Sequence, residues 1–299
     1  MNPVEILHDT IIRIDGAYAP ATIRAYVADF KAFIVFCESR NEPALPASSL
    51  SVAAFIVFMS ATGRSSASIR RAIVGISALH LLNRLPDPSK EPEVRLAMKR
   101  MHRSIGRSSN QAFGIRQEML TRMLGSLDGS LRGLRDAVLI QLAYDTLCRR
   151  SELVSLLALD LAQREANGIH HSILLRKSKV DQELRGRWIA LQTQTVASIE
   201  CWCDAAKITD GFLLRGVDHW GKVTESLSGS QINRIYKRIA MASNLDTTMI
   251  KKISGHSFRI GAAQDLLASG ASMPTIMNRG RWSKSDTVMR YLEQYQVMK

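Results

Sequence analysis

Apolar residues recur every three to four positions through the first 105 residues, which is the spacing of helices that bury one face. Four such segments, at about 22–36, 52–59, 67–82 and 93–105, are separated by prolines, glycines and short polar runs. We expect Thr22 to cap the first of these helices. No alternating strand pattern interrupts the segments, so an all-α N-terminal domain is predicted.

The pattern changes after a polar stretch at residues 106–111 that lacks apolar periodicity. Beyond it, two short apolar runs at 172–175 and 187–191 flank a polar segment and predict a hairpin. The sequence therefore predicts a mainly α chain of two domains. These are an all-α domain over residues 1–107 and a mixed α+β domain with a small antiparallel sheet over residues 112–299. Helical patterns in the second domain lie at about 117–127, 132–144, 194–206, 229–243, 257–269 and 273–279.

Positive charge is in excess and unevenly placed. The chain has 40 Lys and Arg against 27 Asp and Glu, a formal net charge of +13, which favours a polyanionic partner. Residues 60–107 alone hold ten basic and three acidic residues, so two successive helices each present a basic face. Such faces suit DNA phosphates, although ordinary solvated helix faces give the same pattern. The candidate residues here are Arg70, Arg71, Lys99, Arg100, Arg103 and Arg107.

Several other kinds of protein are disfavoured. The sequence has no run of 18 apolar residues, the length needed to span a membrane, and its N-terminus has no apolar signal segment. A cytoplasmic protein is therefore expected. The spacing of Cys201 and Cys203 is too short for a zinc site, and no other ligand pattern stands out. We therefore expect no metal site. Glycine-rich phosphate loops and dinucleotide-binding motifs are also missing from the sequence.

Basic and hydroxyl residues remain as the candidate chemistry. Cleaving a phosphodiester without a metal requires fixed cations for the charge of the transition state and a hydroxyl nucleophile. The second domain holds such residues in ordered segments. These are Arg149 with Glu152, Ser178-Lys179-Val180-Asp181-Gln182, His256-Ser257-Phe258-Arg259, Gly280-Arg281-Trp282, and Val288-Met289-Arg290-Tyr291.

In this order and spacing, the segments resemble the signature of the tyrosine recombinases, or phage-type integrases. Residues 78–80 and 98–101 also look like the DNA-binding helices of that family, so the resemblance covers nearly the whole chain. It implies a helical DNA-binding domain and a catalytic domain that cleave and rejoin DNA through a 3′-phosphotyrosine intermediate and a Holliday junction. No cofactor is implied, because cleavage and ligation are nearly isoenergetic.

The partners implied are double-stranded DNA with inverted-repeat arms and further copies of the chain. One protomer would bind each arm, as a monomer or dimer before synapsis, and a homotetramer would then hold two sites. No membrane partner is implied. The resemblance implies a protein that associates with the nucleoid and is encoded by a bacterium, phage or plasmid.

The family pattern assigns the first set of roles around the scissile phosphate. Arg149, which we expect on an apolar helix, and Arg259 would clamp its two non-bridging oxygens, a task that suits the planar guanidinium. His256 would hydrogen-bond the phosphate or help to take the tyrosine proton. Glu152 would support the local structure. Arg150 is a departure, since the family usually has an apolar or small residue there.

The remaining roles fall to three residues. Trp282 would offer an indole N–H and apolar bulk. Lys179, favoured over Lys177 by its sequence context, would protonate the leaving 5′ oxygen. Tyr291, nine residues after Trp282, is the expected nucleophile, with Tyr295 as its competitor.

Two further expectations concern specificity and assembly. The segment from residue 67 resembles a helix that enters the major groove, with Ser68, Arg71 and Gly75 on its DNA side and Arg70 beside them. Only eight residues follow Tyr291, where relatives often carry a further docking helix. Contacts between N-terminal domains are therefore expected to matter more.

Two rival functions remain. A type IB topoisomerase uses the same chemistry as a monomer, but the helices of the first domain and the inverted-repeat-sized architecture favour a recombinase. A DNA-binding regulator descended from a recombinase would have lost part of the catalytic set, whereas all six positions are filled here.

Overall fold

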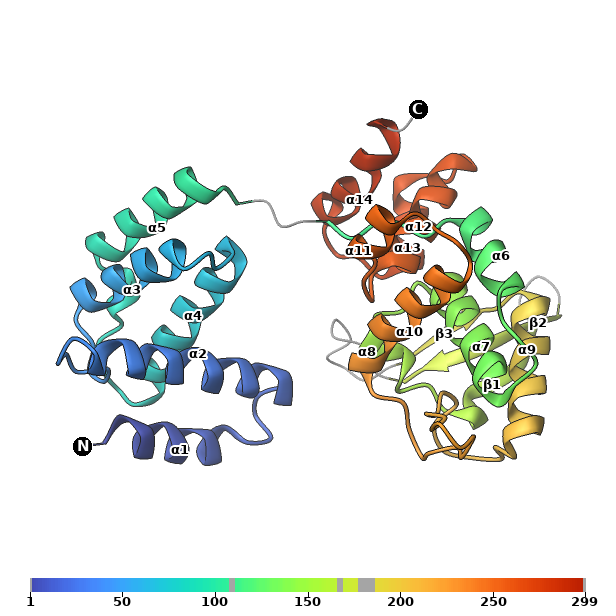
Figure 1. The fold of residues 1–299 in the computed structure, drawn as a ribbon, viewed down its shortest axis with the longest axis horizontal. Helices are drawn as coiled ribbons and strands as arrows, with labels where there is room; N and C mark the ends of the chain where they lie inside the picture. Colours follow the sequence, from blue (N-terminus) through green and yellow to red (C-terminus); the bar gives the residue numbers. More distant parts are fainter. Residues whose placement is uncertain (1, 108–110, 166–168, 177–185, 298–299) are drawn as a thin grey trace. The chain divides into compact units, whose positions relative to one another are not determined.

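The computed structural model describes residues 2–107, 111–165, 169–176 and 186–297, with side chains as far as Leu292 in the last range. The chain divides into two compact units, residues 1–110 and 111–299, each with its own apolar core (Figure 1). Both are rich in helix, and the described sheet is a small antiparallel one in the second unit. The predicted fold class is confirmed.

In its described residues, 2–107, unit 1 contains five α-helices and one short 3-10 turn. Ser48 and Ser65 cap α3 and α4 by accepting hydrogen bonds from backbone N–H groups of the first turn. The expected cap at Thr22 is wrong, because α2 begins two residues earlier at Pro20, whose fixed φ suits the first helical turn. The elements are α1 (Pro3–Ile14), α2 (Pro20–Glu38), α3 (Ser49–Ala61), α4 (Ser66–Leu82), the turn η1 (Pro88–Lys90) and α5 (Pro92–Ile105).

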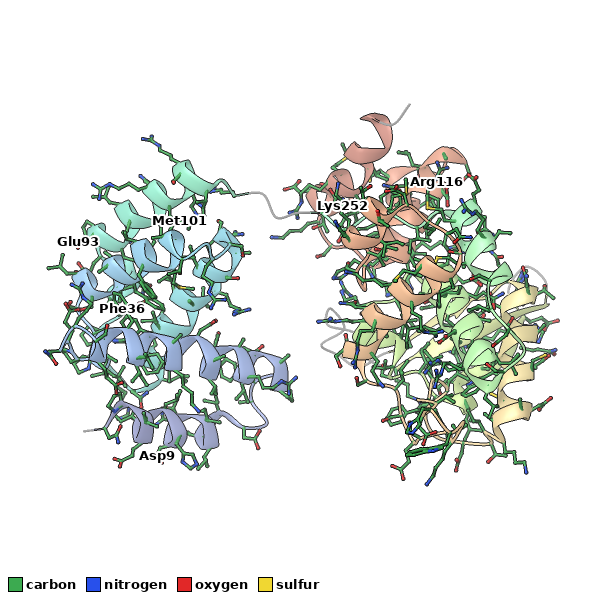
Figure 2. The ribbon with its side chains drawn as sticks, viewed as in Figure 1. Asp9, Phe36, Glu93, Met101, Arg116 and Lys252 are labelled. Carbon is green, nitrogen blue, oxygen red and sulfur yellow. The ribbon has the colours of Figure 1, made fainter. Side chains whose placement is uncertain are left out.

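Aromatic side chains of α2 and α3 form the centre of the unit 1 core. The rings of Phe33 and Phe55 lie 5.1 Å apart between centroids and both are fully buried. Phe36 and Met101 belong to this core, whereas Glu93 is exposed (Figure 2). Each fully buried side chain of this size contributes about 1.5–3 kcal/mol. The core thus fixes the basic helices α4 and α5 to the rest of the unit.

Unit 2 contains a three-stranded sheet and nine α-helices among its described residues. The strands lie in the order β1-β2-β3, both pairs antiparallel, with Ile173 of β2 opposite Leu161 of β1 and Ile189 of β3. The β2–β3 pair matches the predicted hairpin, and β1 was not predicted. The elements are α6 (Gln117–Gly125), α7 (Leu131–Thr146), α8 (Arg150–Leu153), η2 (Ala158–Asp160), β1 (Leu161–Glu165), β2 (Ile169–Leu175), β3 (Arg187–Ala190), α9 (Thr193–Ala206), α10 (Gly229–Ala242), α11 (Thr247–Lys252), α12 (Ser257–Ala268), α13 (Met273–Gly280) and α14 (Ser285–Val297).

The central helix α7 packs against α9 and α12, and most of its residues are buried. Helix α12 is held tightly at Gly261, where a Cβ atom would lie 1.8 Å from the carbonyl oxygen of Ile115. The N–H of Ile115 in turn donates to the carbonyl of Ser257 at 2.9 Å. This close approach requires glycine and fixes the helix that carries Arg259.

The described ranges offer neither a membrane-spanning helix nor a cluster of metal ligands. None of their helices is long and apolar enough to cross a membrane. Within the same residues, no three His, Cys, Asp or Glu side chains gather as they would around a metal ion.

Candidate active site

A pocket of about 220 Å³ in unit 2 gathers residues from three parts of the sequence. It brings together five of the six predicted catalytic residues, which come from the α7–α8 connection, from α12 and from the segment around α14. The sixth, Lys179, lies outside the described residues, as does the side chain of Tyr295. The lining residues are Arg149, His256, Arg259, Arg281, Trp282, Ser283, Lys284, Thr287 and Tyr291.

Arg149 stands immediately before the four-residue helix α8 rather than on an apolar helix, so that part of the prediction is wrong. The reason is Leu147, whose φ of 51° ends α7 and turns the chain. From the N-cap position, Nη1 of Arg149 donates to Oε1 of Glu152 at 2.6 Å, and its backbone N–H donates to Oε2 at 2.9 Å. The carboxylate therefore holds both the backbone and the side chain of Arg149.

Glu152 is buried, with its side chain 4% exposed. Burial alone would raise the pKa of Glu152, but the N–H of Arg149 and the charges of Arg281 and Arg149 outweigh that effect and lower it. The group is thus a carboxylate at neutral pH. This geometry is consistent with the supporting role expected of it.

Arg259 lies deep in the site on α12. Its Nη1 donates to the carbonyl of Leu147 at 2.6 Å, its Nη2 donates to the carbonyl of Gly280, and its guanidinium lies 4.4 Å from the ring centroid of Trp282. Burial and the charges of Arg149 and Arg281 lower the pKa of Arg259 to about 10. It remains a cation at neutral pH, where partial desolvation strengthens its attraction for an anion.

His256 precedes α12 as its N-cap residue, and its side chain reaches the surface at the pocket. Crowding by protein atoms and the positive charges of Arg259, Arg150 and Arg149 lower the pKa of His256. The ring is therefore neutral at pH 7 and can accept a proton or share one with a bound oxygen.

Trp282 and Tyr291 are the two aromatic residues of the pocket lining. Their rings meet edge to face with centroids 5.9 Å apart, and Trp282 is buried whereas Tyr291 is partly exposed. Gly280 makes room for this indole, because a Cβ there would lie 1.9 Å from Trp282. The carbonyl of Tyr291 accepts a hydrogen bond from Gln264 of α12 at 3.0 Å. Together these contacts fix the stretch of α14 that carries the tyrosine.

Residues 114–297 match the model of the phage integrase family. The chain belongs to the phage integrase family. The integrase/recombinase xerD homolog of Selenomonas ruminantium is 28% identical, over 96% of this chain and 85% of that protein. Recombinase cre of Escherichia phage P1 is 24% identical, over 92% and 84% of the two chains.

A solved structure shares the fold of this integrase-family chain. A lambda integrase (75–356) dimer bound to a COC′ core site aligns with a TM-score of 0.62 at 15% identity, over 95% of this chain and 93% of that one. The family and its fold were both expected from the sequence and are confirmed. The chain is thus a tyrosine recombinase by family.

Sequence reasoning missed a third arginine of this recombinase site. The side chain of Arg281 is only 6% exposed, lines the pocket and pairs with Glu152 at 3.2 Å. It ends α13 with a φ of 57°, a left-handed conformation that favours glycine over residues with side chains. Its position directly before Trp282 was the signal that the sequence offered.

Charge at the site is strongly unbalanced. The pocket is lined by three arginines, and the carboxylate that contacts two of them is Glu152. Lys284 adds a further positive charge at the rim. An excess of fixed cations in a partly desolvated pocket favours a polyanion such as a phosphodiester.

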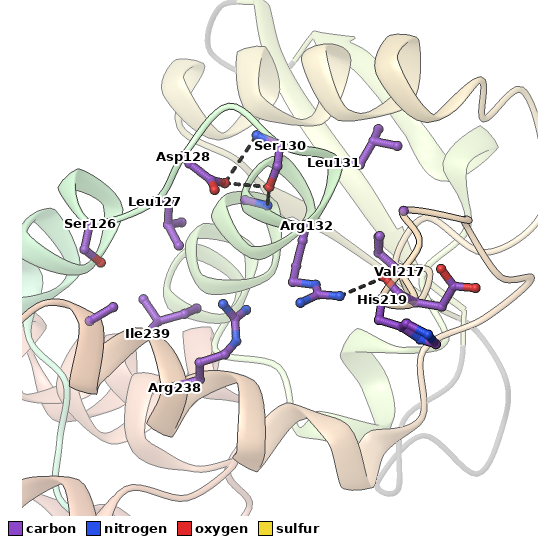
Figure 3. Close-up of a pocket in the computed structure, with 14 residues that line it drawn as sticks. Ser126, Leu127, Asp128, Ser130, Leu131, Arg132, Val217, His219, Arg238 and Ile239 are labelled. Carbon is purple, nitrogen blue, oxygen red and sulfur yellow. Dashed lines mark hydrogen bonds between the residues drawn. The ribbon is translucent and has the colours of Figure 1, made fainter.

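A larger pocket, of about 410 Å³, lies elsewhere in this recombinase, between the start of α7, α10 and the loop at Val217 (Figure 3). Its two arginines are already engaged. Arg132 donates to the carbonyl of Asp218 at 2.7 Å, and Arg238 pairs with the buried carboxylate of Asp136. The lining of this pocket also holds two acidic residues, Asp128 and Asp218, so it lacks the excess of cations that the smaller pocket offers to a phosphate.

The predicted DNA-binding residues of the recombinase occupy different environments in unit 1. Ser68 is partly exposed and bonds to Ser65, and Arg71 pairs with Asp29 of α2 through Nε at 2.7 Å and Nη2 at 2.8 Å. Gly75 was expected on the DNA side, but it is buried against Tyr26, so that placement is wrong. The basic residues of the set all lie exposed, Arg71 included despite its ion pair: Arg70, Arg71, Lys99, Arg100, Arg103 and Arg107.

Proposed function

We propose that this tyrosine recombinase cleaves and rejoins DNA at inverted-repeat sites with Tyr291 as its nucleophile. The observation that carries the proposal is the pocket where Tyr291 and Trp282 meet Arg149, Arg259 and His256. The Oη of Tyr291 attacks the scissile phosphorus, a 3′-phosphotyrosine bond forms and the bond to the 5′ oxygen breaks. The phosphotyrosine bond conserves the energy of the cleaved phosphodiester bond, so an incoming 5′ hydroxyl can reverse the step.

The arginines would stabilise the negative charge that gathers on the non-bridging oxygens in the transition state. Arg149 and Arg259 suit this task, because one is held by Glu152 and the other by two backbone carbonyls. Fixed donors need little reorganisation when the charge develops. The indole N–H of Trp282 is a further candidate donor.

Two groups would move protons. His256 is neutral in the free protein because its pKa is lowered, so it can take the proton that Tyr291 loses during attack. Lys179 would give a proton to the departing 5′ oxygen. That second assignment rests on the sequence, since Lys179 falls outside the described residues.

Assembly would follow the inverted repeat. One protomer binds each arm, and four protomers hold two sites while strands are exchanged through a Holliday junction. The exposed cations of α4 and α5 would bind phosphates near the arms. The lambda integrase relative was solved as a dimer on a core site, which supports pairwise binding. We place the reaction in the cytoplasm, on nucleoid, phage or plasmid DNA.

A trapped covalent complex tests the proposal. Bound sites are first selected from a random duplex library, and a nicked suicide duplex carrying the selected site is then incubated with the protein. We expect a protein–DNA adduct on a denaturing gel for the wild type and for Tyr295→Phe, and none for Tyr291→Phe, which still binds. An adduct from Tyr291→Phe but not from Tyr295→Phe would contradict the assignment.

The same assay separates the rival functions. A regulator descended from a recombinase would bind the selected duplex without forming any adduct. A type IB topoisomerase would relax supercoiled plasmid DNA that lacks the repeat as readily as DNA that contains it. We expect strand exchange only between two DNAs that both carry the inverted repeat.

A further inference from the structure

We infer that Arg281 is a positioning residue of the active site, holding both phosphate-clamping arginines through Glu152 and the residues that join α7 to α8. The inference rests on the proposed function and adds a residue to it. Arg281 lines the same pocket as Arg149 and Arg259, yet its terminal nitrogens are directed at the protein.

Apart from a hydrogen bond from Nη1 to the carbonyl of Arg279 at 3.4 Å, the contacts of the Arg281 side chain gather on residues 146–152. Nη1 donates to the carbonyl of Thr146 at 3.0 Å and Nη2 to the carbonyl of Leu147 at 3.2 Å. Nη2 also lies 3.4 Å from the Sγ of Cys148 and 3.2 Å from Oε2 of Glu152. One side chain thus ties the last residue of α7 to the carboxylate on α8.

Arg149 depends on that same carboxylate. Oε1 of Glu152 accepts from Nη1 of Arg149, while Oε2 accepts both the backbone N–H of Arg149 and Nη2 of Arg281. Without Arg281 the Oε2 atom would lose its side-chain donor, and Glu152 would be freer to rotate or to take up a proton. Arg149 would then lose part of its fixed direction.

Arg259 depends on the same stretch through Leu147. The carbonyl of Leu147 accepts from Nη1 of Arg259 at 2.6 Å and from Nη2 of Arg281 at 3.2 Å. Leu147 is held at a positive φ of 51°, which is unfavourable for a residue with a side chain. The two arginines stabilise the turn at Leu147. The carbonyl at this turn then fixes the position of the Arg259 guanidinium in the pocket.

The position of Arg281 carries two energetic costs, one in its backbone and one in its side chain. Its φ of 57° would suit glycine better than arginine, so the residue is retained at a conformational cost. Its Nε is buried and has no partner among the described residues, which is a further cost. Side-chain contacts must offset both costs, and the contacts it makes lead to the two phosphate-clamping arginines.

The test compares Arg281→Gly, Arg281→Lys, Glu152→Gln and the double variant Glu152→Gln/Arg281→Gly with the wild type. Glycine keeps the backbone relaxed at this φ, so unfolding of the variant is the lesser risk. The rate of adduct formation is measured on the nicked duplex in a single turnover, together with DNA affinity and thermal stability. Arg215→Ala is the matched control, because Arg215 also binds backbone carbonyls but lies outside this pocket.

We expect Arg281→Gly to slow adduct formation by about 10- to 100-fold while DNA affinity changes by less than about threefold, because misplaced groups cost rate more than binding. Lysine should restore only part of the rate, since it lacks the guanidinium fork. The double variant should be no slower than the slower single variant within about twofold, because both changes break one unit. Arg215→Ala should react at the wild-type rate.

A pH profile separates positioning from plain loss of structure. The charge of Arg281 helps to lower the pKa of Glu152 and is not among the charges that act on His256, so removing it should raise the pKa of Glu152 without acting directly on that of His256. Dividing the rate of Arg281→Gly by the wild-type rate therefore cancels the titration of His256, and this ratio should fall as the pH is lowered. Multiplying defects in the double variant, or a ratio that does not change with pH, would overturn the inference. So would a wild-type rate for Arg281→Gly. A wild type that forms no adduct at all would instead overturn the proposed function.

Discussion

At the residue scale, the site is defined by crowded positive charge. His256 lies near Arg149, Arg150 and Arg259, and these charges act on its ring together with the surrounding protein. A proton on His256 therefore costs more in the folded protein than in the unfolded chain. The ring stays neutral to a lower pH than an ordinary histidine, and this is the form that a proton acceptor needs.

The titration of His256 is a direct prediction. Its pKa should lie below the ordinary value of 6.5, and Arg149→Ala should raise it, because one positive neighbour is removed while Glu152 stays. The measurement is an NMR pH titration of the His256 ring protons, assigned with His256→Gln, with free N-acetylhistidine as the reference. A titration midpoint at or above 6.5 that does not change in Arg149→Ala would show that the arginine charges do not affect the pKa of His256.

The identity of Arg281 as a site residue could not be predicted from local pattern. Its partners Thr146 and Glu152 lie 135 and 129 positions away in the sequence, and only the folded chain brings them together. Tyr291 and Trp282 were predicted because their spacing is part of the family pattern. Spacing identifies residues that lie close together in the sequence, whereas contacts between distant segments depend on packing.

At the element scale, long amphipathic helices could be predicted and short elements could not. Helices α4 and α5 begin within one residue of their predicted first residues, because serine or proline marks the start of each helix. Helix α8 has four residues and β1 has the mostly polar sequence Leu-Ala-Gln-Arg-Glu, so neither carries a clear period. That is why Arg149 was expected on the wrong element.

The two basic helices of unit 1 are expected to do different work. Lys99 is exposed on α5, while the guanidinium of Arg71 on α4 is directed by the buried carboxylate of Asp29. We expect Lys99→Ala to weaken binding to all sequences alike and to lower the salt slope by about one unit. Arg71→Ala should change the preference at one or two base pairs in each arm, a difference of about 1–3 kcal/mol.

The Asp29 contact supplies the control for that prediction. Asp29 is buried beneath Arg71, so Asp29→Ala should relax the same base pairs as Arg71→Ala by freeing its direction. The measurement is affinity across a library of single base-pair variants at two salt concentrations. A uniform loss for Arg71→Ala, with an unchanged sequence profile, would limit Arg71 to phosphate contact or to tying α2 to α4.

At the scale of the whole molecule, charge opposes assembly in the absence of DNA. Each chain carries a formal charge of +13, and four chains brought together would repel one another over distances comparable to the screening length, about 8 Å at physiological salt. DNA phosphates remove this repulsion where each protomer binds its arm. Assembly of the proposed homotetramer should therefore depend on DNA rather than precede it.

The last prediction follows from this dependence on DNA and concerns protomer number. Tyr291→Phe, which we expect to hold DNA without cleaving it, should be a monomer or dimer when free. It should place two protomers on one duplex that carries both arms, and four protomers on two such duplexes. Mass photometry at rising salt concentration measures each state. Added salt should dissociate the DNA complexes, because counterions released into a more concentrated solution gain less entropy. The same salt should leave free protein unchanged or more associated, because it screens the repulsion between chains.

A duplex with one arm scrambled is the control and should hold a single protomer. A stable tetramer without DNA at low salt would show that apolar contacts between protomers outweigh their charge, and DNA would then not be what assembles them.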